Sequence, residues 1–406
     1  MTENKHDELE QLLRNSGISN TPAAKSGIKE RFEQRLLELN LNQTEALEIM
    51  NIEARTLHGL LGGGQKRVDF LAIKKLGLFL GMADTELVSL IIENVEKNNK
   101  EDVDELKVRD FILKNFDLVN LKKCGFIDNI TDYKEIEKKI VSYFGYDSIF
   151  DFGKNSYDVA YSSGKPKPKD KLIRDFWVES CVENLKKINN YYEYDRAALI
   201  EYFPNIRWHS INEEKGLYQV IRDLFKLGIT VIFEPYMNTL YVRGATFCVK
   251  NKPCIVLTNY TDFYPSLWFT LIHELHHVLF DWEDVFINSY HLSGENDLFS
   301  MKEEEADNFA REYLYSNDKL KTVTPYIFQH PLIVDNANTN QVHPSLIYIF
   351  YCFDNAGSDK RVWGKFRKRI PSIDKTIEAL GNNPWQNRKT IKEIANQRKE
   401  KQFNNL

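Results

Sequence analysis

In the first third of the chain, apolar residues recur at every third or fourth position, a spacing that predicts short helices. We expect them over residues 28–39, 42–50, 53–61 and 68–80. Asn42 and Glu45 form a capping box that starts the second helix. Asn51 tolerates the left-handed conformation of a tight turn, and Gly62-Gly63-Gly64 stops the third helix. The pattern predicts a small all-α domain.

Short helices around a tight turn, with Leu41-Asn42-Gln43, Ala46, Ile52 and Leu57, resemble the Cro/cI or XRE-type helix-turn-helix family. The resemblance implies that Gln43 approaches a phosphate or base of DNA, and that the major groove is faced by Glu53, Arg55 and Thr56. Between residues 25 and 86, however, nine Lys and Arg balance nine Asp and Glu, whereas DNA readers usually show a basic footprint. Residues 26–82 therefore either bind DNA or serve dimerisation or partner docking.

A small sheet is expected in the second half of the chain, after further helices over residues 84–160 and 170–226. Segments rich in β-branched residues predict antiparallel strands over 229–233, 239–242, 245–249 and 254–258. We choose 254–258 as an edge strand, which can pair with an extended peptide by β-addition. The later loop 282–300 contains His291, interpreted as an exposed loop residue although it can compete as a metal ligand.

The chemistry is expected on residues 267–280, an apolar stretch that contains His-Glu-x-x-His. On a helix, His273 and His277 lie one turn apart on one face, so both imidazoles can bind one metal ion. Zinc held by two imidazoles and a carboxylate keeps a position open for water and lowers the pKa of that water to about 7. Glu274 is the candidate base that takes the water's proton, whereas His276 points elsewhere on the helix.

A third metal ligand is expected on residues 302–314, which read as an amphipathic helix. Glu303 and Asp307 share a face with two alanines that permit close helix approach. We expect Glu303 to bind the metal and Asp307 to accept a hydrogen bond from a ligand imidazole. Glu305 is the alternative ligand. Taken alone, acidic residues at a helix start need no metal, because the helix dipole favours them.

His273-Glu274-x-x-His277 followed by Glu303-x-x-Ala306-Asp307 resembles the ImmA/IrrE family of metallo-endopeptidases, relatives of the thermolysin-type gluzincins. The resemblance covers about residues 217–355 and includes His343-Pro344. It implies an α+β fold with a zincin-like metallopeptidase domain, and zinc as the cofactor. It also implies a protein substrate, such as a helix-turn-helix repressor in a stress, mobile-element or defence circuit. His343 is a candidate catalytic donor to the developing oxyanion, with plain turn chemistry as the alternative.

These expectations divide the chain into five parts. They are a flexible arm (1–25), a helix-turn-helix domain (26–100), a helical middle region ending in a Ser/Gly/Pro/Lys linker (101–165), the metallopeptidase domain (166–355) and a basic helical tail (356–406).

The net charge of −5 is unevenly distributed, because residues 360–406 hold 13 Lys and Arg against four Asp and Glu, a net of +9. Trp363, Phe366 and Trp385 lie among these basic residues. A basic tail of this kind can bind phosphate or an acidic partner. A solvated helix surface is the commoner explanation of such a charge pattern. The five Cys show no Cys-x-x-Cys spacing and indicate reduced thiols. With no apolar leader and no membrane-length apolar window, we expect a cytoplasmic protein without membrane contact.

Two functions from different classes follow. The first is a zinc endopeptidase that cleaves a regulatory protein. The second is an XRE-type DNA-binding regulator or antitoxin-like protein whose zincin domain senses or docks, with homodimerisation supplying two DNA half-sites. A purely structural metal is disfavoured, because a closed site has no need of Glu274.

Overall fold

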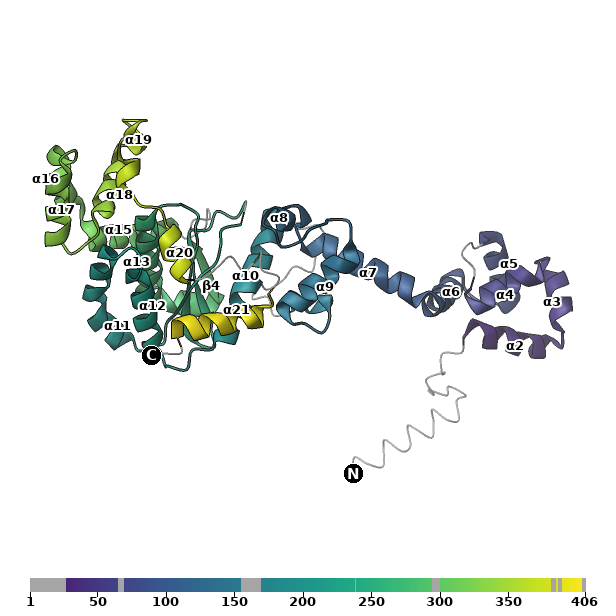
Figure 1. The fold of residues 1–406 in the computed structure, drawn as a ribbon. Helices are drawn as coiled ribbons and strands as arrows, with labels where there is room; N and C mark the ends of the chain where they lie inside the picture. Colours follow the sequence, from purple (N-terminus) through teal and green to yellow (C-terminus); the bar gives the residue numbers. More distant parts are fainter. Residues whose placement is uncertain are drawn as a thin grey trace, which may run out of the picture. The chain divides into compact units, whose positions relative to one another are not determined.

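The computed structural model describes residues 27–64, 69–154, 169–237, 239–293, 300–380, 385 and 389–403. The chain divides into two compact units, residues 1–107 and 108–406 (Figure 1). Helix α7 (Lys100–Asn115) crosses the division. No described helix has both the length and the apolar character needed to span a membrane.

The first unit is a set of short helices around one apolar core. These are α2 (Ile28–Leu39), α3 (Gln43–Met50), α4 (Ala54–Gly62), α5 (Phe70–Leu80) and α6 (Asp84–Asn98). The predicted capping box is present, since Asn42 Oδ1 accepts from Glu45 N at 3.0 Å and Glu45 Oε2 accepts from Asn42 N at 2.8 Å. Asn51 has φ 48° at the turn between α3 and α4. The predicted helices in this unit are thus confirmed, apart from residue 68, which lies outside the described residues.

Gly63 ends α4 with φ 67°. A Cβ at this position would lie 2.7 Å from the carbonyl carbon of Asn94, so glycine also permits α4 to approach α6 closely.

The second unit has one continuous core that includes both the middle region and the sheet. Its first helices are α8 (Leu118–Lys123), α9 (Tyr133–Phe144) and α10 (Lys169–Ile188). Phe126 and Tyr143 pack on Phe176 of α10, with ring centroids 5.0 Å and 6.2 Å apart. The structure does not describe the expected linker as far as residue 168. Helices α9 and α10, which precede and follow it, contribute to the same core.

The sheet is mixed, so the antiparallel expectation is wrong. Its strands are β1 (Thr230–Phe233), β2 (Gly244–Val249), β3 (Lys252–Leu257) and β4 (Tyr290–Ser293), in the order β1-β3-β2-β4. β1 and β3 are parallel, and the other pairs are antiparallel. Lys250 and Asn251, with φ 53° and 62°, form the tight turn between β2 and β3.

Two strand predictions fail for local reasons. Residues 239–242 form no strand, because Thr239 has φ 73° and Leu240 N donates to Met237 O in a turn. The segment 254–258 is not at an edge, because β3 pairs on both sides and its residues from Pro253 to Leu257 are buried. Within the described chain, the edges belong to β1 and β4.

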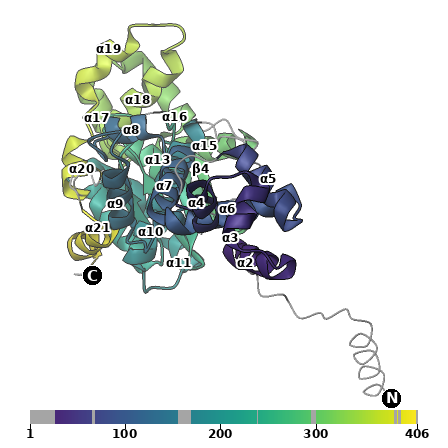
Figure 2. The same cartoon turned by 90° about the vertical axis from the view of Figure 1, so that its right-hand side faces the viewer.

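The long helix α13 (Tyr264–Phe280) packs on β2 and β3 and against α15 (Ser300–Tyr315). Helices α16 (Asn317–Val323), α17 (His330–Thr339), α18 (Pro344–Asn355) and α19 (Val362–Phe366) gather on one side of this unit (Figures 1 and 2). The remaining helices are α11 (Arg196–Tyr202), α12 (Gly216–Lys226), α14 (Trp282–Asn288), α20 (Asp374–Leu380) and α21 (Ile391–Arg398). Four 3₁₀ segments are also described in the unit: η1 (Ile149–Asp151), η2 (Phe203–Ile211), η3 (Thr324–Tyr326) and η4 (Arg367–Arg369). A π-helical segment, η5 (Lys399–Phe403), follows α21.

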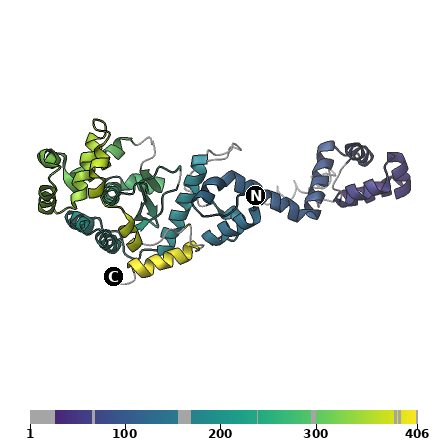
Figure 3. The same ribbon diagram turned by 45° about the horizontal axis from the view of Figure 1, so that its top comes forward.

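The basic C-terminal segment is part of the second unit's core. Helix α21 runs beside α10 (Figures 1 and 3). Arg398 Nη1 donates to the fully buried Glu234 at 2.6 Å, and Arg398 Nη2 donates to Phe233 O at 2.6 Å. Phe366 and Trp385, which were expected to interleave a cationic surface, are each 1% exposed. These aromatic residues therefore contribute to packing.

Candidate metal centre

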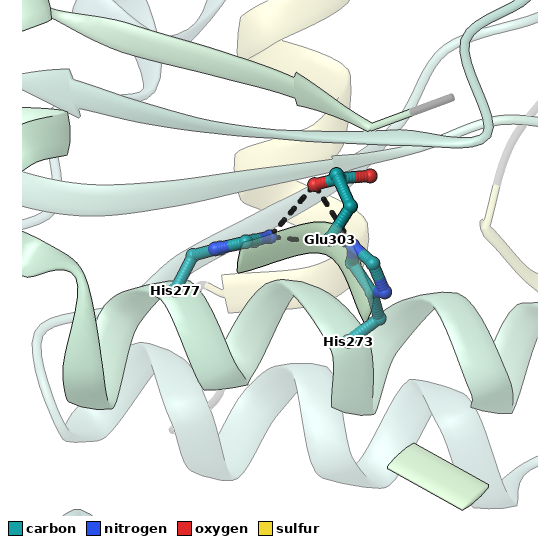
Figure 4. A group of neighbouring side chains, drawn as sticks. All are labelled: His273, His277 and Glu303. Carbon is teal, nitrogen blue, oxygen red and sulfur yellow. Dashed lines mark hydrogen bonds and ion pairs between the residues drawn. The ribbon is translucent and has the colours of Figure 1, made fainter. Parts of the chain in front are cut away.

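Three potential metal ligands converge on one point in the second unit. His273 and His277 extend from adjacent turns of α13, and their Nε2 atoms are 3.2 Å apart. Glu303 Oε1 lies 3.5 Å from His273 Nε2 and 3.3 Å from His277 Nε2. Figure 4 shows Glu303 reaching both imidazoles. Ligand atoms of these three residues all lie within 4.8 Å of one another.

Packing of α13 against α15 brings the ligands together. Helix α13 is buried almost all round, as its apolar sequence predicts. On α15, Ala306 and Ala310 are fully buried, which allows the two helix backbones to approach closely. Glu303 stands one turn before Ala306, so it meets His273 and His277 across this contact.

A carboxylate orients each ligand imidazole. His273 Nδ1 lies 2.8 Å from Asp307 Oδ1, and His277 Nδ1 lies 2.8 Å from Asp281 Oδ2. With the protons on Nδ1, both rings donate to carboxylates and direct Nε2 towards Glu303, as in carboxylate–histidine–zinc arrangements. Asp307 was expected in this place. Asp281 was missed, although its position four residues after His277 on the same face is a readable signal.

The charges of the centre are strongly coupled. Burial alone lowers the pKa of both ligand imidazoles, but hydrogen bonds to Asp307, Asp281 and Glu303 raise the pKa of His273 and of His277 to about 9. Burial likewise raises the pKa of Glu303, yet its contacts with the histidines outweigh burial and hold this pKa well below its usual range. The centre therefore favours a cation at the point where these side chains meet, either protons or a metal.

The expected base, Glu274, is fully buried beside the ligands. Its Oε2 accepts from Thr246 Oγ1 of β2 at 2.7 Å. Its Oε1 has no hydrogen-bond partner within the described part of the chain. Gly244 makes room for this oxygen, since a Cβ there would lie 2.5 Å from Glu274 Oε1. A buried carboxylate oxygen without a partner is costly, and a water beside the metal position would satisfy it.

Zinc fits this set of residues. Two imidazole nitrogens and one carboxylate oxygen form the ligand set of open, catalytic zinc sites. A second grouping of His276, His277 and Asp281 also satisfies metal-ligand distances. It uses the Asp281 carboxylate that already holds His277 Nδ1, so we assign Asp281 to orientation.

His291 is part of the centre, so its interpretation as an exposed loop residue is wrong. It lies on edge strand β4, its side chain is only 12% exposed, and its Nε2 is 2.6 Å from Glu303 Oε1. Its ring centroid is 4.3 Å from that of His277. Ser293, two residues further along β4, places Oγ 3.1 Å from His273 Nε2. Thus β4 forms one wall of the centre.

The structure does not bring His343 to the centre. Its Nδ1 lies 2.6 Å from Ser345 Oγ and its Nε2 lies 3.5 Å from Glu213 Oε1. Its ring packs on Tyr264, which precedes His273 by nine residues, about 13 Å along a helix. His343 is instead the N-cap of α18, and its side chain accepts a hydrogen bond from Ser345 N, which agrees with the alternative interpretation of this residue as part of a turn. The alternative ligand Glu305 is exposed, whereas Glu303 faces the histidines.

The residues implied for DNA contact all lie on the first unit. Gln43 begins α3, Glu53 is the N-cap of α4, and Arg55 and Thr56 lie in the first turn of α4. Gln43, Glu53 and Arg55 are exposed, and Thr56 is half-buried. Gln43 Nε2 is 3.2 Å from His58 Nε2, so the start of α3 does lie beside α4.

Comparison with known proteins finds no matching family model, no matching curated protein and no matching solved structure. Function is therefore inferred from the side chains of the centre.

Proposed function

We propose that this protein is a zinc-dependent endopeptidase. The observation that carries the proposal is Glu274, a fully buried carboxylate with one oxygen unsatisfied by the described chain, held beside two imidazoles and Glu303. A structural zinc site would use four protein ligands and no neighbouring base. The resemblance to the ImmA/IrrE metallo-endopeptidases agrees with this chemistry.

In this proposal, His273, His277 and Glu303 hold the ion. Bound zinc would supply Lewis acidity, which lowers the pKa of water and polarises a peptide carbonyl. Glu274 accepts the proton of the attacking water on Oε1 and later delivers it to the departing amine nitrogen. Thr246 fixes Oε2, so that Oε1 remains aimed at the water. Asp307 and Asp281 keep the imidazoles in the orientation that binding requires.

We further propose that the substrate is a regulatory protein, such as a helix-turn-helix repressor. The small helical first unit would then dock this substrate or bind DNA beside it. The alternative function is an XRE-type regulator or antitoxin-like protein whose metal centre senses or docks without cleaving. Replacement of Arg55 distinguishes DNA binding from docking of a protein. If residues 26–82 bind DNA, the affinity for DNA should fall with Arg55→Ala and should weaken steeply as the salt concentration rises.

The test of the endopeptidase is a comparison of the full-length parent with Glu274→Gln. Both should hold about one zinc per chain after dialysis, measured by mass spectrometry of the metal. Only the parent should cleave peptides from a randomised mixture, because an amide cannot accept the water's proton, and loss of a general base costs about 10² to 10⁴ in rate. Equal cleavage by both proteins would remove Glu274 from the mechanism. Zinc binding without cleavage by either would favour the sensing alternative.

A further inference from the structure

A cavity of about 320 Å³ opens beside the metal centre and plays no part in the chemistry described so far. Helices α13, α15 and α18 supply most of its wall, and the segment from Thr258 to Thr261 supplies another side. Its apolar lining consists of Pro265, Phe269, Ile349, Phe350 and Phe353.

Two residues of the cavity lining, Thr270 and Asp307, are neighbours of the groups proposed to react. Thr270, which lines it, stands one turn before Glu274 on α13. A Cβ at Gly244 would touch both Thr270 Cγ2 and Glu274 Oε1 at 2.5 Å, so these two side chains flank the same point. Asp307 also lines the cavity and holds His273 at 2.8 Å. If the carbonyl of a substrate peptide lies beside the metal position, a side chain next to that carbonyl can therefore enter this cavity.

The charged groups of the lining disfavour a cation. The lining contains two arginines, Arg243 and Arg311, and one carboxylate, Asp307. Asp307 is already engaged by His273 at 2.8 Å and lies 3.8 Å from Arg243. Arg311 lies 4.8 Å over the Phe350 ring, and its charge is already paired with Asp354, because Arg311 Nη2 is 2.5 Å from Asp354 Oδ2. A lysine or arginine side chain would therefore meet two arginines whose neighbouring carboxylates, Asp307 and Asp354, are already paired.

We propose that this cavity is a specificity pocket that binds a large apolar side chain next to the scissile bond and rejects lysine and arginine. The proposal rests on the endopeptidase function and names its substrate class, namely peptide segments with a residue such as phenylalanine or leucine at that position. The apolar walls take the side chain out of water, and the arginines exclude cations.

Phe353 provides a variant that changes the pocket without threatening the fold. Its side chain is 54% exposed and contacts the Trp363 ring at 5.1 Å. Phe328 is a matched control, since it is 63% exposed, contacts the Phe366 ring at 5.3 Å and does not line the pocket. Phe353→Ala removes one apolar wall, whereas Phe328→Ala removes an equal side chain elsewhere. Ser266→Phe, at a half-buried position of the lining, should fill the pocket instead.

The first measurement does not depend on cleavage. Peptidyl hydroxamates that chelate zinc and carry a benzyl, methyl or aminobutyl side chain are titrated into the zinc-loaded full-length protein by calorimetry. The benzyl compound should bind about tenfold to a hundredfold more tightly than the other two. Phe353→Ala and Ser266→Phe should each reduce this preference at least several-fold, and Phe328→Ala should retain it. Equal binding of all three compounds, or tightest binding of the aminobutyl compound, would overturn the pocket assignment.

The second measurement maps cleavage sites in a randomised peptide mixture by mass spectrometry. Cleavage beside large apolar residues, with Lys and Arg depleted, is the expected result. Cleavage without such a preference would refute the pocket and leave the endopeptidase intact. A benzyl preference in calorimetry with no cleavage of any peptide would leave the pocket intact and refute the endopeptidase.

Discussion

Replacement of Gly244 by alanine tests whether the position of Glu274, the proposed base, is as important as its identity. The added Cβ would lie 2.5 Å from both Glu274 Oε1 and Thr270 Cγ2, whereas ordinary van der Waals contact begins at 3.4 Å. Glu274 would therefore have to move by about 0.9 Å, the difference between these two distances. A misplacement of about 1 Å in a catalytic group costs about 10² in rate, or about 2.7 kcal/mol of barrier.

The same substitution overpacks a buried contact between β2 and α13. We expect it to destabilise the protein by about 1–3 kcal/mol, measured as a shift of the urea midpoint. Zinc content should stay at the parental value, because neither Gly244 nor Glu274 is a ligand. The three readouts therefore separate a displaced base from a lost metal.

Gly364→Ala is the matched control. A Cβ at Gly364, within α19, would meet nothing within 4 Å. Alanine in a helix interior is more favourable than glycine by about 0.5–1 kcal/mol, so this variant should be slightly stabilised and fully active. Parental kcat/KM in Gly244→Ala, with a folded protein and full zinc, would show that Glu274 tolerates the displacement and would refute its role as a positioned base.

The remaining predictions concern the metal itself. His277→Ala should lose most of the zinc, whereas His276→Ala on the same helix should keep it; equal metal content in the two variants would contradict the ligand assignment. Glu303→Ala should weaken zinc binding far more than Glu305→Ala in a chelator competition, because only Glu303 faces the imidazoles. Since the ligand imidazoles have their pKa raised to about 9, zinc must displace protons, so apparent affinity should rise from pH 6.5 to 8.5. An affinity independent of pH over this interval would mean that the metal-free imidazoles are neutral.

Features encoded by neighbouring residues could be predicted from the sequence. The capping box of Asn42 and Glu45, the left-handed Asn51 and the glycine stop after α4 each depend on a few consecutive residues, and the structure has all of them. The spacing of His273 and His277 belongs to the same class, because one helical turn determines it.

Features that depend on pairing between distant parts of the chain were harder to predict from the sequence. Strand β4 is short and contains only one large aliphatic residue, and it exists because it pairs with β2, whose paired residues lie 43 to 49 positions earlier, from Phe247↔Tyr290 to Gly244↔Ser293. His291 therefore looked like a loop residue, although that pairing places it against Glu303. His343 shows the opposite case, since its His-Pro pair is compatible with either an oxyanion donor or turn chemistry, and only the fold places it at the start of α18, beside the N-terminal end of α13. Hydropathy alone could not indicate that Phe366 and Trp385 in the basic C-terminal segment are buried.

The candidate metal centre joins two helices that are separated along the sequence, so a bound ion would affect the stability of the fold. Two ligands come from α13 and the third comes from α15, so a bound ion would cross-link a helix contact that the buried alanines already support. Asp307 and Asp281 contact the Nδ1 atoms of the imidazoles, and the buried alanines join the two helices, so we expect the fold to form without the ion. Zinc would then add stability by mass action, about 4 kcal/mol at a thousand times its dissociation constant, without being needed to form the fold. Zinc fingers differ in this respect, because their folding free energy comes from the metal; we expect the ion proposed here to serve chemistry instead.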